Sequence, residues 1–307
     1  MQTKKITKTK KSNQLLSSGH RACAGCGQMV AARTVLNALG PNTIIANATG
    51  CLEVTTTPYP ESAWGVPWIH SLFENASAVA SGILASLKQQ GKDKKVKVVA
   101  QGGDGGTFDI GFGLISGMWE RGENILYICY DNEAYSNTGM QASGATPWAS
   151  STTTTPAGSG KTIDAIGSHQ NKKDMIAIAL AHGLNYVAQT TVGYLSDIEN
   201  KVKKAIEIEG PAYIQILSPC IPGWKIKSNQ AIQLGRLAVQ TGLYPSIEYI
   251  NGELTNKIKI PKKQPAVEEY LKEQKRFSHL FKTKQGLKQI KHIQELANKN
   301  IEKYKLK

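Results

Sequence analysis

The 307-residue chain has no long hydrophobic run. A membrane-spanning helix needs about 20 mostly apolar residues, and no window of even about 18 uninterrupted apolar residues occurs here. The lysine-rich N-terminus is also not followed by the apolar stretch of a secretory signal. We therefore expect neither a membrane span nor a secretory signal, and we expect a cytoplasmic location.

Cysteine is scarce as well, with five in the whole chain. Cys23 and Cys26 form a C-x2-C pair, Cys51 follows Thr-Gly, and Cys220 follows Ser-Pro. In a long chain without a secretory signal, such a pair indicates metal ligation rather than disulfides. Four thiolates suit either Zn²⁺ or an iron–sulfur cluster. A zinc ribbon usually has a second C-x2-C pair, and its absence from the sequence favours a cluster.

Acidic residues are also few, because 23 Asp and Glu accompany 37 Lys and Arg, a net charge of +14. The excess lies in the two ends: residues 1–12 hold five lysines and no acid, and residues 257–307 hold 15 basic and five acidic groups. Residues 13–256 are nearly neutral. Solvated basic tails that attract anionic partners explain this pattern, so a zinc-containing nucleic-acid-binding protein is only a remote alternative.

Apolar runs that predict strands alternate with segments of helical spacing. The predicted strands are at 42–48, 97–100, 125–130, 184–188 and 212–217, and the predicted helices are at 71–90, 109–121, 172–183, 193–208 and 228–241. Strands and helices that alternate with short connections predict an α/β fold, with a mostly parallel sheet covered by helices on both faces.

The chain divides into three parts. Residues 1–14 are expected to be a disordered basic tail, and residues 15–241 one α/β domain. Residues 242–307 lose the alternating pattern and form a basic C-terminal extension with amphipathic helices at 266–276 and 285–304. A role for this extension in contacting a partner subunit is our expectation.

A glycine-rich turn follows the strand at 97–100. Gly103, Gly105 and Gly106 flank Asp104, so the backbone there can approach phosphate oxygens closely. Asn132 follows the next strand, and carboxylate and amide oxygens are suitable ligands for Mg²⁺. Both side chains are expected at the carboxyl ends of strands, where open α/β sheets bind their ligands. This pattern indicates a site for a diphosphate and Mg²⁺.

Three segments in order make the pattern specific: GDGGTFDIGFG, YDNEAYSNTGMQ and TTTTP. They resemble the beta subunits of pyruvate:ferredoxin oxidoreductases (pyruvate synthases). The similarity runs from about Gly19 to Trp224 and continues more loosely into the extension. It implies that residues 15–241 form a domain of the type that binds the diphosphate of thiamine diphosphate, together with an iron–sulfur cluster.

The resemblance also assigns roles to residues. It implies that Mg²⁺ is held by Asp104, Asn132 and the main-chain carbonyl of Ala134, and that Gly103, Gly105 and Gly106 form the diphosphate turn. Asn137 corresponds to a catalytic residue beside the reactive carbon of the cofactor and the substrate. Gln28 stands where some relatives have a cofactor-contacting Glu, so a contact with the cofactor is expected but not specified.

The motifs C-A-G-C-G, T-G-C and S-P-C match those of a 4Fe-4S cluster on Cys23, Cys26, Cys51 and Cys220, with Cys51 also close to the thiamine. Cys129 lies in an apolar strand, where a free cysteine behaves as a small core residue. For His20 and His70 the sequence leaves structural and functional roles open.

The resemblance implies a subunit of an enzyme that oxidatively and reversibly decarboxylates pyruvate with coenzyme A, giving acetyl-CoA and CO2. Electrons would pass through the cluster to ferredoxin. A separate alpha subunit would supply the Glu that faces the pyrimidine ring, and gamma- and delta-type subunits are further expected partners. The alternative substrates are 2-oxoglutarate, branched-chain or aryl 2-oxo acids, and oxalate. No nucleic-acid partner is expected.

Overall fold

The computed structural model describes residues 14–158 and 166–307. It contains one eight-stranded sheet with the order β2-β1-β3-β4-β6-β5-β7-β8. The first six strands in this order are parallel, and β7 and β8 are antiparallel additions at one edge. The strands are β1 (Thr43–Asn47), β2 (Trp68–His70), β3 (Lys97–Gly103), β4 (Leu126–Asp131), β5 (Tyr186–Thr191), β6 (Ala212–Leu217), β7 (Ile247–Ile250) and β8 (Glu253–Lys257).

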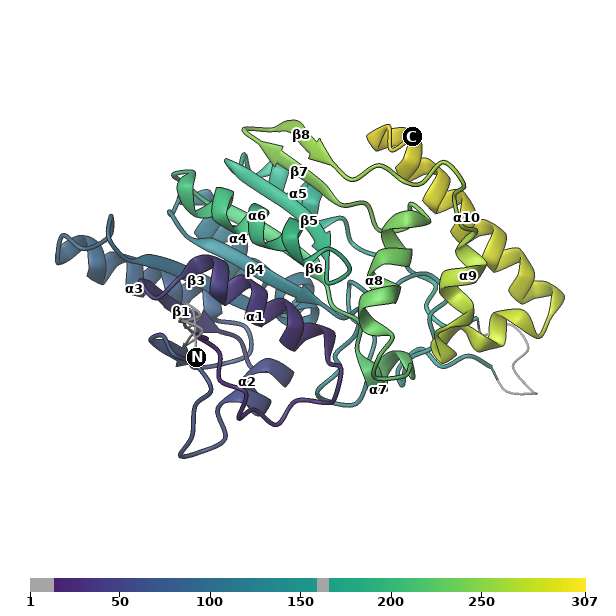
Figure 1. Cartoon of the computed structure of the whole chain (residues 1–307), viewed down its shortest axis with the longest axis horizontal. Helices are drawn as coiled ribbons and strands as arrows, with labels where there is room; N and C mark the ends of the chain where they lie inside the picture. The colour runs from purple at the N-terminus through teal and green to yellow at the C-terminus, as the bar shows by residue number, and fades with distance from the viewer. Residues whose placement is uncertain (1–13, 159–165) are drawn as a thin grey trace, which may run out of the picture.

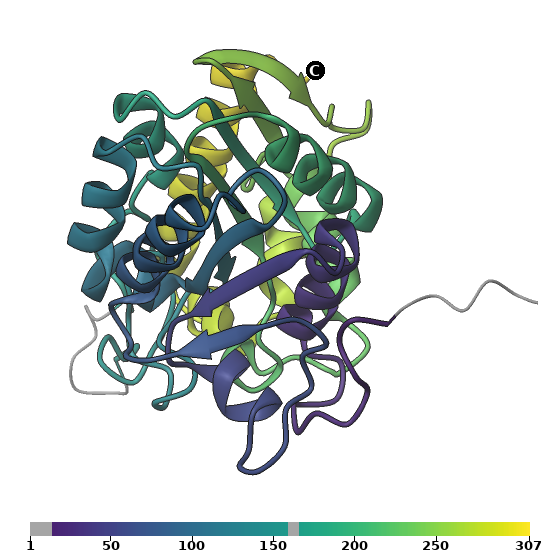
Figure 2. The ribbon, with the colours of Figure 1, turned by 90° about the vertical axis from the view of Figure 1, so that its left-hand side faces the viewer.

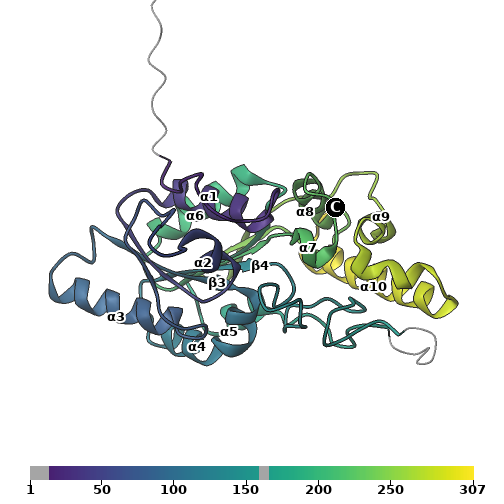
Figure 3. The same cartoon turned by 90° about the horizontal axis from the view of Figure 1, so that it is seen from below.

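Helices cover both faces of this sheet, which confirms the predicted α/β class (Figures 1 and 3). On one face lie α1 (Gly27–Leu39) and α6 (Leu195–Glu207), and on the other α3 (Ala76–Gln89), α4 (Phe112–Glu120) and α5 (Met175–Ala181). The end-on view shows the strands passing between the two layers (Figure 2). Central strands such as β4 are buried along their whole length, which explains their continuous apolar sequence.

Shorter elements complete the chain. They are α2 (Cys51–Thr56), the π-helix η1 (Gly105–Ile110), α7 (Ile221–Trp224), α8 (Ala231–Gln240), α9 (Val267–Lys272), the 3₁₀ helix η2 (Lys275–Phe281) and α10 (Lys284–Tyr304). A third core cluster joins α8 to α9, η2 and α10. Across the described residues, no helix has both the length and the apolarity that a membrane crossing requires.

Most predicted elements are present, with shifted ends. The helix expected at 71–90 begins at Ala76, and the one expected at 109–121 is divided into η1 and α4. The sequence did not predict α1, α2, β2 or the β7–β8 hairpin. Of the predicted disordered tail, residues 1–13 lie outside the described part of the chain. The proposed boundary at residue 241 stays a prediction.

Candidate cofactor and thiolate sites at the strand ends

Four adjacent parallel strands, β1, β3, β4 and β6, end at the same edge of the sheet. The segments that follow them are those the sequence singled out: T-G-C after β1, D-G-G after β3, N-E-A after β4 and S-P-C after β6. Parallel strands all point the same way, so motifs that lie far apart in the sequence meet at this edge. The sheet therefore brings the predicted diphosphate motif and two of the predicted thiolate motifs together.

The glycine turn after β3 leaves room on one side and packs tightly on the other. A Cβ added at Gly103 would meet no atom closer than 4.0 Å, whereas one at Gly105 would come within 2.4 Å of the Tyr135 ring. Tyr135 in turn packs edge-on against Phe73, with ring centroids 5.8 Å apart. The turn is thus fixed by the protein at Gly105 and open towards a ligand at Gly103.

Three oxygen-bearing groups meet beside this turn. One end of the Asn132 amide lies 2.8 Å from the Ala134 carbonyl oxygen and 3.3 Å from Asp104 Oδ1. The same end lies 2.6 Å from the Ser136 hydroxyl. With the amide nitrogen at this end, it donates to the Ala134 and Asp104 oxygens. With the amide oxygen there, it accepts from the Ser136 hydroxyl, and no proton lies between it and the Ala134 and Asp104 oxygens. An octahedral Mg²⁺ site has ligands at about 2.0–2.1 Å, so neighbouring ligand oxygens lie about 2.9 Å apart. The second orientation therefore fits a bound cation.

Asp104 is fully buried. Its two oxygens accept hydrogen bonds from the Asn132 backbone N–H (3.1 Å) and the Ser143 hydroxyl (2.5 Å). Burial, and then the nearby Asp131 carboxylate, raise the pKa of Asp104 to about 8. A buried carboxylate with this environment is stabilised by a cation at its free edge.

A cavity extends from the glycine turn to Cys51. Its lining combines the turn, the Asn132–Thr138 loop, the end of β1 and Gln28, which is buried on α1. Cys51 Sγ lies 3.7 Å from Asn137 Oδ1 inside this cavity. The structure thus brings together all the predicted cofactor residues, and Asn137 faces a thiol as well as the cavity.

A second cavity contains the four predicted thiolates. Its lining residues are Ala22, Cys23, Cys26, Gln28, Met29, Cys51, Thr55, Asn132, Ser136, Met140, Ser218, Pro219, Cys220, Ile221 and Pro222. Within the described residues, no three or more His, Cys, Asp and Glu side chains are gathered closely enough to hold a single metal ion. Thiolates around one Zn²⁺ lie within about 4 Å of one another, because Zn–S bonds are about 2.3 Å. The four thiols here line one cavity but are not gathered closely enough for a single ion.

Close backbone packing holds the C-x2-C loop against the segment after β6. A Cβ at Gly25 would come within 1.8 Å of the Ser228 carbonyl oxygen, and one at Gly27 within 2.9 Å of the Pro219 backbone. Gly25 also has φ +78°, a conformation that favours glycine. The glycines of C-A-G-C-G therefore let the first two thiols approach Cys220.

The thiols repel one another's anionic forms. Burial, followed by Cys220, Cys26 and Cys23, raises the pKa of Cys51 to about 12. Burial likewise raises the pKa of Cys26 and Cys220. Four thiolates at this position require a positively charged centre among them, which iron or zinc supplies.

Other residues considered from the sequence lie elsewhere. Cys129 is buried in β4 within the core and lines neither cavity. The His70 Nε2 atom lies 2.6 Å from the hydroxyl of Thr49, which lines the cofactor cavity. His20 Nδ1 is buried without a hydrogen-bond partner. Ser143, which donates to Asp104, was not expected from the sequence, because no motif of its own marks that serine.

Comparison with known proteins shows the family of the chain. Residues 23–216 match the family "Thiamine pyrophosphate enzyme, C-terminal TPP binding domain". The chain is 52% identical to pyruvate synthase subunit PorB of Methanosarcina barkeri, over 95% of this chain and 97% of the relative. It is 40% identical to pyruvate synthase subunit PorB of Thermotoga maritima, over 94% of this chain and 90% of the relative.

A solved structure has the same fold. The 2-oxoglutarate:ferredoxin oxidoreductase from Magnetococcus marinus aligns with a TM-score of 0.57 and 24% identity, over 76% of this chain and 82% of that chain. The resemblance found in the sequence motifs is confirmed. The chain belongs to the thiamine pyrophosphate enzymes, as a subunit of the pyruvate synthase PorB type within the 2-oxo-acid:ferredoxin oxidoreductases.

Proposed function

We propose that this chain is the beta subunit of a pyruvate synthase. The complete enzyme converts pyruvate and coenzyme A into acetyl-CoA and CO2, and releases two electrons and one proton. The electrons pass through a 4Fe-4S cluster on this chain to ferredoxin, and the reaction is reversible. The chain provides the diphosphate half of the thiamine site and the first electron acceptor.

One observation carries this proposal: the cofactor cavity and the thiol cavity adjoin. They share four lining residues, which are Gln28, Cys51, Asn132 and Ser136. An electron relay beside an organic cofactor is what separates an oxidoreductase from a thiamine enzyme without electron transfer. The shared position of Cys51 supports direct transfer between the two.

Thiamine diphosphate with Mg²⁺ fits the first cavity. Gly103, Gly105 and Gly106 would face the diphosphate, and Asp104, Asn132 and the Ala134 carbonyl would hold Mg²⁺. The cofactor, when bound, supplies the electron sink that decarboxylation of a 2-oxo acid needs. The support is the convergence of oxygens around Asp104 and the open side of the turn at Gly103.

A 4Fe-4S cluster on Cys23, Cys26, Cys51 and Cys220 fits the second cavity. The four thiols line one cavity but are not gathered closely enough for a single ion, and four cysteine thiolates are the usual ligands of such clusters. Cys51 would be both a ligand and the thiolate nearest the cofactor. Asn137, 3.7 Å from that thiol, would contact the substrate at the reacting carbon. Gln28 is buried between the two cavities and would contact the cofactor from this side.

The pyrimidine side of the site requires a partner chain. Among the described residues that line the cofactor cavity, Asp104 is the only carboxylate, and it belongs to the diphosphate turn. We therefore assign the Glu that activates the cofactor to an alpha subunit, and electron exit to gamma- or delta-type subunits and ferredoxin. The isolated chain with reconstituted cofactors should not oxidise pyruvate, whereas the assembled complex should. Robust turnover by the chain alone would contradict this assignment.

A second substrate class remains a candidate because of one relative. The chain is 43% identical to ketoisovalerate oxidoreductase subunit VorB of Pyrococcus abyssi, over 86% of each chain. The substrate carboxylate is expected to bind on the partner chain, which this structure does not contain. Comparing kcat/KM of the assembled complex for pyruvate, branched-chain 2-oxo acids and 2-oxoglutarate decides between them; pyruvate should be preferred by at least about tenfold.

A further inference from the structure

Glu133 occupies an unusual place in the cofactor loop. It lies between Asn132 and Ala134, the two residues of this loop that we assign to Mg²⁺. Its φ of +66° is in the left-handed region, which residues other than glycine rarely adopt. This conformation allows the Asn132 amide and the Ala134 carbonyl to face one point, 2.8 Å apart, while the Glu133 side chain points elsewhere.

The Glu133 side chain is buried between two cations. Arg276 Nη2 donates to Glu133 Oε2 at 2.5 Å, and Lys172 Nζ to Glu133 Oε1 at 2.9 Å. Lys172 also pairs with Asp131 at 2.5 Å, so it is shared between two carboxylates. Arg276 pairs with no carboxylate other than Glu133 among the described residues.

Arg276 comes from the C-terminal extension, in η2. Its guanidinium stacks on the Trp224 ring at 3.8 Å, and its Nε donates to the Gln274 side chain at 2.9 Å. The Trp224 indole N–H donates to the Asn132 carbonyl at 2.9 Å, and the Trp224 backbone N–H donates to the Cys220 carbonyl at 2.9 Å. Arg276 therefore contacts both the loop that follows β4 and the segment that carries Cys220.

The charges around the loop do not balance. Three buried carboxylates, Asp104, Asp131 and Glu133, accompany two cations, Lys172 and Arg276. The cations pair with Asp131 and Glu133, and Asp104 is left facing the cavity. A divalent cation beside Asp104 would offset the remaining negative charge. The loop can hold that cation only while Glu133 stays paired with its cations, because an unpaired Glu133 carboxylate would no longer keep the loop in its left-handed turn.

We infer that Arg276 is a positioning residue for Mg²⁺: by holding Glu133 in its left-handed turn, it aims the Asn132 and Ala134 oxygens at the metal. The C-terminal extension is then a working part of the cofactor site, in addition to any contact with other subunits. This inference rests on the proposed function, since it requires Mg²⁺ and thiamine diphosphate at this loop.

The test compares Arg276→Gln with Lys275→Gln in the assembled complex, prepared free of cofactor. Lys275 is the exposed neighbour in the same helix, so the two variants lose the same charge. Binding of thiamine diphosphate is titrated calorimetrically at a series of Mg²⁺ concentrations. Losing a partner behind a metal ligand typically weakens metal binding by about 10–100-fold. The Mg²⁺ concentration for half-maximal binding should rise by about that factor in Arg276→Gln and stay unchanged in Lys275→Gln.

Saturation with Mg²⁺ separates positioning from damage. Excess Mg²⁺ should restore full cofactor binding in Arg276→Gln, whereas a misfolded loop would stay defective. Arg276→Lys, which keeps a cation, should fall between wild type and Arg276→Gln. Glu133→Gln should resemble Arg276→Gln, and the double variant should be no worse than either single variant. An unchanged Mg²⁺ requirement in Arg276→Gln, or a loss that Mg²⁺ does not restore, would overturn the inference.

The outcome also remains distinct from failure of the proposed function. If the wild-type complex itself bound no thiamine diphosphate in the presence of Mg²⁺, the assignment of the cofactor cavity would fall. If the wild type bound the cofactor normally and the Arg276 and Glu133 variants matched it, only the positioning role would fall.

Discussion

Among single residues, Cys51 connects the two halves of the site. It begins α2 at the end of β1, lines both cavities and lies beside Asn137. The sequence could place this thiol because a Thr-Gly-Cys motif after a short apolar run is a local pattern. It could not identify the partner of Glu133, since Arg276 is 143 residues away and lies within a lysine-rich segment that resembles a solvated tail.

His279 should make the stability of the extension sensitive to acid. Burial lowers its pKa, and its Nε2 lies 2.8 Å from the Ile166 carbonyl oxygen. A histidine with a lowered folded-state pKa stabilises the fold above its unfolded pKa of about 6.5, and this contribution is lost as the pH falls through the lower folded value. Between about pH 7.5 and 5.5, the Tm of wild type should therefore fall more than that of His279→Gln. Parallel Tm–pH curves for the two proteins would contradict this account.

At the element scale, the site is a consequence of parallel strand order. The glycine turn, the Asn132 loop, and Cys51 and Cys220 were predictable because each follows a buried strand with a distinctive polar motif. These motifs lie together because β1, β3, β4 and β6 are neighbours in the sheet. No local sequence pattern predicts the order of strands in a sheet, so their proximity could not be predicted. The β7–β8 hairpin was missed because its outer strand is largely exposed and has little apolar sequence.

The glycine turn gives a matched pair of substitutions. Gly103→Ala places a methyl group in open space, so it should leave Tm nearly unchanged but lower thiamine diphosphate affinity by at least about tenfold, because it fills the ligand's approach. Gly105→Ala drives a methyl group into the Tyr135 ring and should lower the free energy of unfolding by about 1–3 kcal/mol. Calorimetric titration measures the thiamine diphosphate affinity of the two variants, and thermal unfolding measures their stability. Normal cofactor binding in Gly103→Ala would argue against the turn as the diphosphate site.

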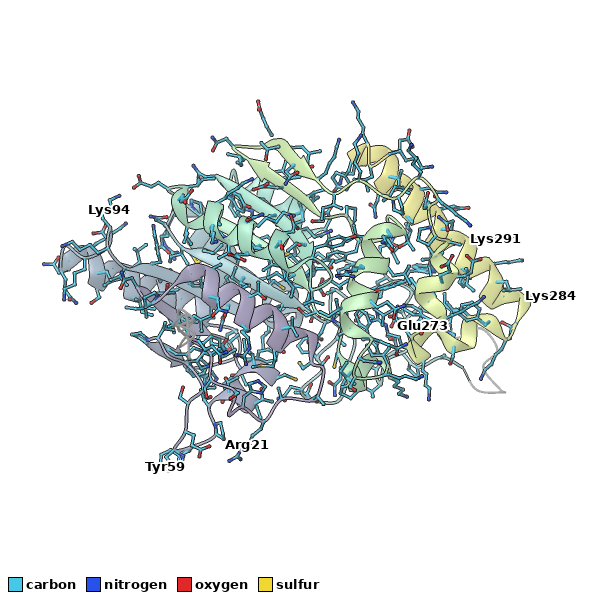
Figure 4. All side chains as sticks on the ribbon, viewed as in Figure 1. Arg21, Tyr59, Lys94, Glu273, Lys284 and Lys291 are labelled. Carbon is cyan, nitrogen blue, oxygen red and sulfur yellow. The ribbon has the colours of Figure 1, made fainter. Side chains whose placement is uncertain are left out.

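At the scale of the whole molecule, the basic extension has two sides. Lys284 and Lys291 of α10 point away from the body (Figure 4), while Ile290, Ile293 and Ala297 of the same helix are buried in a core shared with α8. The count of charged residues in the sequence revealed only the exposed, basic side. The buried side follows from the apolar periodicity of 285–304, which predicted an amphipathic helix but not the surface that it covers.

Removing the extension should therefore disrupt the fold. Truncation after residue 256 deletes many buried side chains, among them Tyr270, Phe277 and Ile293. Their loss exposes Leu234 and Ala238 of α8, which pack in the same core, and removes Arg276 from buried Glu133. Because a typical unfolding free energy is only about 5–15 kcal/mol, the remaining chain is not expected to tolerate this loss. The truncated chain should not show a cooperative thermal transition, whereas exchanging exposed Lys284, Lys288 and Lys291 for Gln should leave Tm within about 2 °C. A truncated chain that unfolds cooperatively at the wild-type Tm would contradict the shared core.

We have proposed that four thiolates next to a thiamine site hold an iron–sulfur cluster. The direct measurement is the metal content and visible spectrum of the anaerobically purified chain, with two cysteine variants alongside. We predict about four iron and four sulfide per chain and a broad visible absorption. Both should be lost in Cys220→Ser and kept in Cys129→Ala, which removes a core thiol that lines neither cavity. Stoichiometric zinc without visible absorption, or full iron content in Cys220→Ser, would contradict the account.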